Sequence, residues 1–151
     1  MKLLFLDIDG VLNHRTFLSA VFAKHDGDDQ INHLDPAAIE HLNRIIDETS
    51  CLVILSSAWR MFGLGQVQQW LRARGFRHKI LWITPTKISG IRGQEIDLYL
   101  KRLSKQPESF CILDDSHDID PHKANWVWCD PNEGLTAAKA DEAIRMLNFP
   151  G

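Results

Sequence analysis

Short apolar runs alternate along the chain with longer segments of helical periodicity. The runs at 2–7, 51–56, 79–83, 109–114 and 125–129 are each followed by polar or turn residues, which predicts five strands. Between the strands, apolar residues recur every three or four positions, which predicts helices. Strands that alternate with helices in this way indicate a parallel sheet with right-handed crossovers.

Four helices are predicted in the intervening segments. Asp35 and Pro36 suit the N-cap and the first position of the first helix. The second helix ends near Gly75, and Thr136 caps the last one. The apolar faces are, in order, Ile39, Leu42, Ile45 and Ile46; Leu64, Val67, Trp70 and Leu71; Ile96, Tyr99, Leu100 and Leu103; and Ala140, Ala143, Ile144 and Leu147.

Residues 13–34 have the least regular pattern. They are rich in His, Asp and Gly near 25–33, and we interpret them as a mobile flap over the end of the first strand. The remaining pattern contains no repeat and no second domain, so residues 1–151 are expected to form one domain. The predicted fold class is α/β, a Rossmann-like three-layer sandwich around a central, mainly parallel five-stranded sheet.

The composition is that of a globular protein and excludes few functions. Of the 151 residues, 44% are hydrophobic, and the formal net charge of −3 gives no overall attraction to nucleic acid or membranes. The sequence predicts neither a transmembrane helix nor a signal peptide, so we expect a cytoplasmic protein without membrane partners. Cys51, Cys111 and Cys129 lie in or beside apolar runs and are expected to be free and buried.

The first strand leads directly to candidate catalytic chemistry. Asp7 and Asp9 follow its apolar residues, and Gly10 then turns the chain. Both carboxylates therefore lie at the carboxyl end of a strand, where open α/β sheets bind their ligands. Two neighbouring acids repel each other unless a cation lies between them or one stays protonated. Mg²⁺ prefers such oxygen ligands and is the expected cofactor.

Polar residues also follow two other strands. Ser56, Ser57 and Arg60 come after the second strand, and their hydroxyl and guanidinium groups are suited to binding phosphate oxygens. Taken alone, the serines are better explained as helix caps, and Arg60 is equally suited to the solvated surface of a helix. The fourth strand ends in the acidic pair Asp114 and Asp115, which adds further charge that needs a counter-ion.

These motifs together resemble those of the haloacid dehalogenase (HAD) superfamily, most of whose members are phosphohydrolases. They are similar to those of a small group of HAD proteins without cap domains, some of which are fused to RNA-repair enzymes. The resemblance runs from Leu3 to about Leu147 and implies a HAD-like hydrolase domain with no cap domain. The matching segments are Asp7-Ile8-Asp9-Gly10-Val11-Leu12, Leu55-Ser56-Ser57-Ala58-Trp59-Arg60, Arg92-Gly93-Gln94-Glu95-Ile96 and Leu113-Asp114-Asp115-Ser116.

The resemblance implies roles for the acidic residues and one serine. Asp7 is the expected nucleophile, which forms an aspartyl-phosphate, and Asp9 is the expected general acid and base. The expected Mg²⁺ ligands are Asp7, Asp115 and the backbone carbonyl of Asp9, with Asp114 supporting them. The hydroxyl of Ser56 is expected to donate a hydrogen bond to the phosphate.

The remaining substrate contacts leave alternatives open. Ser57, Arg60 and Gly10 are candidates for substrate binding. The cation that holds the phosphate against the nucleophile is expected to be Arg92, which begins the third motif, and Lys87 is its rival. Both basic residues would count as ordinary surface charges without the surrounding motifs.

Other polar residues carry weaker signals. Asp118 is expected to support the acidic loop, and His14 to lie near the site, whereas His117 and His122 are expected to face solvent. One basic cluster is interpreted as favourable charge at a helix end rather than as a nucleic-acid site. It consists of Arg72, Arg74, Arg77, His78 and Lys79.

The sequence thus predicts a Mg²⁺-dependent phosphomonoesterase. Because HAD proteins without caps act on large substrates, the expected partner is a nucleic-acid end, a nucleotide or a phosphoprotein, although the net charge does not support nucleic acid. A receiver-like module or a catalytically silent phosphate-binding scaffold is the alternative. The presence of Asp9 and the complete set of motifs favour the enzyme.

Overall fold

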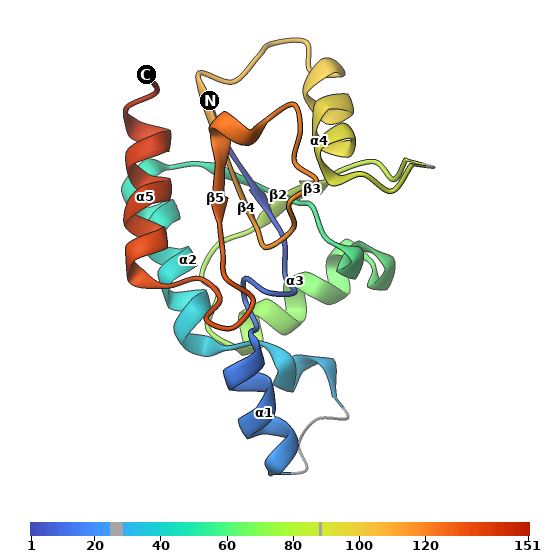
Figure 1. Cartoon of the computed structure of the whole chain (residues 1–151), viewed down its shortest axis with the longest axis vertical. Helices are drawn as coiled ribbons and strands as arrows, with labels where there is room; N and C mark the ends of the chain where they lie inside the picture. Colours follow the sequence, from blue (N-terminus) through green and yellow to red (C-terminus); the bar gives the residue numbers. More distant parts are fainter. Residues whose placement is uncertain (25–28, 88) are drawn as a thin grey trace.

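A five-stranded parallel sheet organises the chain (Figure 1), and the computed structural model describes residues 1–24, 29–87 and 89–151. The strands are β1 (Lys2–Leu6), β2 (Leu52–Leu55), β3 (Ile80–Ile83), β4 (Ser109–Asp114) and β5 (Trp126–Trp128). Their order in the sheet is β3-β2-β1-β4-β5, and each neighbouring pair is parallel. The central strand, β1, is therefore flanked by the two strands that end in the other motifs.

The register of the sheet aligns the ends of these three strands. Leu6 in β1 is paired with Leu55 in β2 and with Leu113 in β4. The backbone N–H groups after β1 and β2 continue the ladder, donating to Leu113 and Leu6 at 3.0 and 2.8 Å. The residues that follow the three paired leucines are consequently neighbours at one edge: Asp7, Ser56 and Asp114.

Helices cover both faces of the sheet. The helices α2 (Pro36–Thr49), α3 (Leu64–Ala73) and α5 (Ala137–Asn148) share one cluster of buried side chains with the strands, and α4 (Arg92–Lys101) packs in a second cluster on the opposite face. This is the predicted Rossmann-like three-layer sandwich. The described ranges contain no inserted cap domain. The three cysteines are free and buried, as predicted.

The predicted helix starts are confirmed by their capping contacts. In α2, the Asp35 carboxylate accepts a hydrogen bond from the N–H of Ala37 at 2.9 Å, and Pro36 occupies the first turn. In α5, the hydroxyl of Thr136 accepts one from Lys139 at 3.3 Å. In the part of the chain that the structure describes, no helix has the length and apolar character needed to cross a bilayer.

The segment 13–34 is more regular than the sequence pattern indicated. It contains α1 (Arg15–Ala23) and a 3₁₀ helix (Gln30–His33). The helix forms because apolar residues four positions apart, Phe17 and Val21, share one face, while the His14 ring caps the first turn. Residues 25–28, which belong to the segment expected to be a mobile flap, lie outside the described residues.

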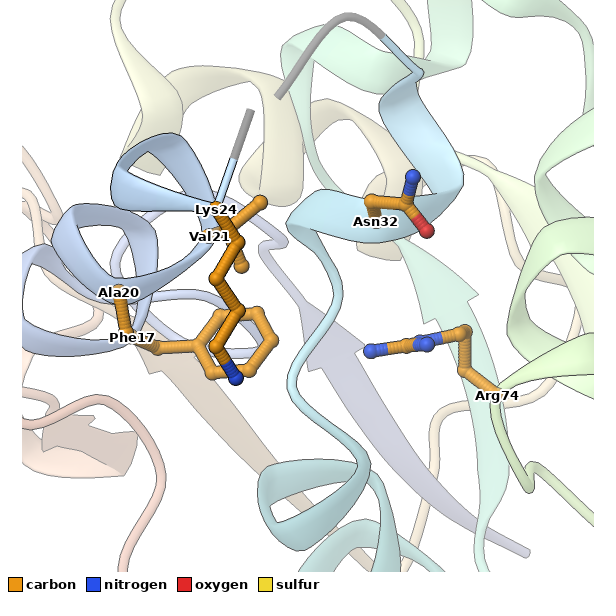
Figure 2. A pocket seen from close by; sticks show the side chains of 6 residues that line it. All are labelled: Phe17, Ala20, Val21, Lys24, Asn32 and Arg74. Atoms are coloured by element: carbon orange, nitrogen blue, oxygen red, sulfur yellow. The ribbon is translucent and has the colours of Figure 1, made fainter. Parts of the chain in front are cut away.

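The helix α1 extends beyond the carboxyl ends of the strands (Figure 1). Between α1 and the 3₁₀ helix lies a hollow of about 200 Å³. Figure 2 shows that Lys24 and Arg74 point into it from opposite sides, with the Phe17 ring beside Lys24. Arg74 is anchored by its Nε, which donates to the carbonyl of Leu34 at 3.0 Å. The helix α1 and the 3₁₀ helix therefore form an ordered surface beyond the carboxyl ends of the strands (Figure 1).

Candidate active site

Three carboxylates meet at the carboxyl edge of the sheet. Asp7 follows β1, Asp114 ends β4 and Asp115 comes next, and one oxygen from each lies within 4.8 Å of the others. Asp7 is 5% exposed and Asp114 is fully buried. The register of β1 and β4 forces these acids together, so the cluster is a direct consequence of the parallel pairing.

Burial and mutual repulsion make this cluster costly when it is fully ionised. Burial, and then the Asp114 carboxylate, raise the pKa of Asp7 well above its ordinary value, against the opposing charge of Arg92. Burial likewise raises the pKa of Asp114 to about 6. Its Oδ2 is a buried atom without a hydrogen-bond donor among the described residues. A cation coordinated by these oxygens would relieve both penalties, so the three acids fit a Mg²⁺ site.

Arg92 supplies positive charge to the same site from the first turn of α4. Its Nη1 lies 3.6 Å from Asp7 Oδ1 and 3.6 Å from Asp114 Oδ2. The same nitrogen donates to the hydroxyl of Ser56 at 3.5 Å. These contacts are long, and the guanidinium has donors left for an anion that enters the site.

The two serines after β2 have different surroundings. Ser56 is buried with its hydroxyl towards Arg92, beside the nucleophile candidate Asp7. Ser57 instead caps the 3₁₀ helix Ala58–Phe62, because its Oγ accepts a hydrogen bond from the N–H of Trp59 at 3.1 Å. The geometry favours Ser56 as the phosphate-binding hydroxyl, and a substrate contact by Ser57 stays a prediction.

Asp9 is exposed and separate from the acidic cluster. Its Oδ1 accepts hydrogen bonds from Asn13 Nδ2 at 2.9 Å and from Trp59 Nε1 at 3.0 Å. Asn13 also accepts one from the N–H of Gly10 at 2.9 Å, which fixes the turn between the acids. Neither Asn13 nor Trp59 was among the site residues that the sequence predicted. The expected metal contact through the Asp9 carbonyl stays a prediction.

Gly10 is required by the packing of this turn. It has a φ of +81°, a conformation that other residues rarely adopt. A Cβ at this position would also overlap the Asp115 carboxylate. Gly10 thus allows the first motif to approach the acidic pair, and its proposed contact with substrate remains a prediction.

Arg60 and Lys87 lie beside the site in different settings. Arg60 is hydrogen-bonded to Thr84 and Thr86, each at 3.1 Å, and its Nη2 forms an ion pair with the buried Glu95 at 2.8 Å. Glu95 also accepts a hydrogen bond from the backbone N–H of Lys87 at 3.1 Å. The exposed ammonium of Lys87 has no partner among the described residues. Of the two candidate cations, the structure brings Arg92 to the acids.

The acidic loop after β4 is fixed from two sides. Trp126 and Trp128 of β5 donate from their indole nitrogens to the backbone carbonyls of Asp114 and Asp115, at 3.0 and 3.1 Å. Asp118 accepts a hydrogen bond from the backbone N–H of Arg92 at 3.1 Å and so caps α4. Asp118 therefore supports the site as expected, whereas the tryptophan contacts were not foreseen.

The histidines and the predicted basic cluster are largely engaged elsewhere. His14 pairs with Asp35 at 2.9 Å, His122 with Asp97 at 3.1 Å, and the His117 ring contacts Trp126. In the basic cluster, Arg77 pairs with Glu40 and Asp47, and His78 also pairs with Asp47, at distances of 2.8 to 3.1 Å.

A protein-family model described as "HAD domain in Swiss Army Knife RNA repair proteins" matches residues 3–140. This match covers all four motifs and most of the chain. The chain belongs to this HAD family. Membership supports a HAD-type, phosphatase-like function, and HAD domains generally use Mg²⁺. Searches of curated proteins and of solved structures found no match.

Proposed function

We propose that this HAD domain is a Mg²⁺-dependent phosphomonoesterase with Asp7 as its nucleophile. The observation that carries the proposal is the grouping of a buried carboxylate, two further acids, a guanidinium and a hydroxyl at one sheet edge. The acids suit a cation, while Arg92 and Ser56 suit the oxygens of a phosphoryl group. A phosphate between them would bring phosphorus beside Asp7.

Asp7, Asp114 and Asp115 would hold the metal. When bound, Mg²⁺ would neutralise charge on the transferring phosphoryl group and let the acids ionise together. The buried Asp114 Oδ2 supports this assignment, since it accepts no hydrogen bond from the described residues and has only a long ion-pair contact with Arg92, at 3.6 Å. Arg92 would add a second positive charge on the phosphate oxygens, and Ser56 would donate a hydrogen bond.

The reaction would proceed in two displacements. Asp7 attacks phosphorus, a phosphorus–oxygen bond forms, and the ester bond to the leaving oxygen breaks as Asp9 supplies its proton. Asp9 then takes a proton from water, which attacks the aspartyl-phosphate and releases inorganic phosphate and free Asp7. This sequence replaces one difficult displacement by two easier ones. The exposed position of Asp9 suits both proton transfers.

A phosphorylated end of a nucleic acid is the substrate class that we favour. The matching family is described as a domain of RNA-repair proteins, and the described ranges contain no cap that would enclose a small substrate. Nucleotides and phosphoproteins are the competing substrates.

The proposal is tested with a generic aryl phosphate, with and without Mg²⁺. We expect activity that requires Mg²⁺ and falls by several orders of magnitude in Asp7→Asn. Asp141→Asn is the matched control, because it removes an equivalent charge from the surface of α5, where Asp141 pairs with Arg44. When Asp9→Asn protein is quenched with acid during the reaction, mass spectrometry should detect a phosphoryl group on Asp7. Activity that survives in Asp7→Asn would exclude this mechanism.

A further inference from the structure

The sheet has an uncovered margin at β3. This strand lies at the edge of the sheet, and α4 covers only part of the face on its own side. A groove of about 410 Å³ remains between β3 and α4. Its lining includes two aromatic rings, Trp82 and Tyr99, together with the guanidinium of Arg102.

The aromatic rings of this groove are available to a ligand. Trp82 is 60% exposed, which is unusual for the largest apolar side chain. Tyr99 is half-buried, and its ring is held edge-on by Phe5, with centroids 5.6 Å apart. Exposed aromatic rings of this kind are stacking surfaces for nucleic-acid bases, and such stacking tolerates any base.

The charges beside β3 are also complementary to a polyanion. Arg102 lines the groove, while Arg72 and Lys79 line a second hollow of about 290 Å³ on the α3 side of the same strand, across the sheet edge from the groove. None of these three forms an ion pair within the described ranges, and the described lining of both hollows contains no acid. By contrast, the neighbouring Arg77 is neutralised by Glu40 and Asp47.

The groove continues towards the proposed active site. At the carboxyl end of β3 it is lined by Thr84 and Thr86, which accept hydrogen bonds from Arg60. Arg60 pairs in turn with Glu95 of α4, which lies one turn from Arg92. Arg60 therefore lies between the groove and the phosphate-binding side chains and is bonded to residues on both sides.

We propose that the β3–α4 groove binds a single strand of nucleic acid. Bases stack on Trp82 and Tyr99, a backbone phosphate contacts Arg102, and the strand end reaches Asp7. Delivery of the terminal phosphate rests on the proposed function, whereas binding of the strand does not. A phosphopeptide is the less suitable ligand, because its charge is confined to a few side chains and it has no bases to stack on an exposed indole.

Binding is tested by fluorescence anisotropy with a labelled RNA octamer that carries a terminal phosphate. The Asp7→Asn protein is used so that the phosphate is retained. In this Asp7→Asn background, Trp82→Ala should weaken binding of the octamer about fivefold or more, whereas Trp82→Phe should retain most of the affinity. Leu81→Ala is the matched control, because Leu81 is exposed on the same strand but is not among the groove's lining residues. Equal affinity in Trp82→Ala and Leu81→Ala would overturn the proposal.

The contact of Arg102 is tested through its salt dependence. Arg102→Ala should lower the slope of log affinity against log salt by about 0.7, the value for one phosphate contact with a single strand. Lys101→Ala removes the same charge from the adjacent position, where Lys101 pairs with Asp97 at 2.7 Å, and should leave the slope unchanged. An equal change in both variants would indicate general charge attraction and would overturn the groove as the binding site.

Hydrolysis assays distinguish RNA binding in the groove from the proposed phosphatase chemistry. In protein with Asp7 intact, Trp82→Ala should lower kcat/KM for the phosphorylated octamer and leave that for the aryl phosphate unchanged. If neither substrate is hydrolysed but RNA binding still depends on Trp82, the groove is supported and the proposed chemistry fails. If a phosphopeptide displaces RNA and depends more strongly on Trp82, the nucleic-acid assignment fails.

Discussion

The carboxylate of Asp9 is oriented by two side chains outside the acidic motifs. Asn13 and Trp59 both donate to Oδ1, at 2.9 and 3.0 Å. Among the described residues no group donates to Oδ2, so this is the oxygen available for proton transfer. Trp59 is itself fixed by edge-on contacts with Phe62 and Trp70. A rigid aromatic cluster thus sets the position of the proposed general acid and base.

Loss of the indole N–H should therefore reduce turnover. Trp59→Phe keeps a ring in the cluster but removes the hydrogen bond to Asp9, and we expect kcat for an aryl phosphate to fall roughly tenfold, the effect of one charge-assisted hydrogen bond. Trp70→Phe is the control, because it changes the same cluster without a hydrogen bond to the site. A change in KM with kcat unchanged would argue against a role in orienting Asp9.

For individual residues, the sequence predicted the acidic side chains but not the side chains that orient Asp9. Asp7, Ser56 and Asp114 were predictable because each lies at the end of a recognisable strand, and parallel register aligns strand ends. The hydrogen bond from Trp59 to Asp9 joins residues 50 positions apart, and it depends on the path of a short 3₁₀ helix. Local pattern carries no signal for such a contact.

Among the elements, α4 has the greatest influence on the site, since it begins at Arg92. Its first turn is tied to the β2 side of the sheet by the ion pair of Arg60 with Glu95, and to the β4 side by Asp118. Gly93 allows close contact with the loop after β4, because a Cβ there would overlap backbone atoms of Ile119. The first turn of α4, which carries Arg92, is therefore held by contacts on both sides.

Breaking the ion pair should affect stability and phosphate binding together. Arg60→Ala leaves Glu95 buried without a cation, and we expect the free energy of unfolding to fall by about 3 kcal/mol, measured by urea denaturation. Inhibition by inorganic phosphate should weaken as well, because Arg92 loses its support. Arg77→Ala breaks exposed ion pairs instead and should change neither quantity much. Unchanged phosphate inhibition in folded Arg60→Ala would show that α4 does not depend on this pair.

Most elements could be predicted because their patterns are local. The five strands and the helices α2 to α5 follow from apolar periodicity and from caps such as Asp35 and Thr136. The exception is α1, which has no buried residue and contributes none to the buried clusters that the other helices form with the sheet. Its cap is a histidine, which is not among the preferred capping residues.

For the whole molecule, the acidic cluster couples folding to pH and to metal. Without metal, Asp7 and Asp114 have raised pKa values in the folded protein, so above pH 3.8 the folded state binds more protons than the unfolded chain. The stabilisation that these groups contribute should therefore be complete below pH 3.8 and be lost as the pH rises through the raised pKa values, that of Asp114 being about 6. Bound Mg²⁺ would reverse this loss, because it favours the ionised carboxylates.

Asp114→Asn should expose this coupling in thermal unfolding. Because the pKa of Asp114 is about 6 rather than 3.8, ionising this carboxyl group costs the folded protein about 3 kcal/mol more than it costs the unfolded chain. In EDTA at pH 7.5 the variant should therefore melt at a higher temperature than the wild type, and the difference should shrink towards pH 4.5. With Mg²⁺ the order should reverse, because the variant has lost a ligand, while Asp141→Asn should follow the wild type throughout. If Mg²⁺ raised the melting temperature of wild type and Asp114→Asn equally, the ion would be bound elsewhere, and the acidic cluster would not be the metal site.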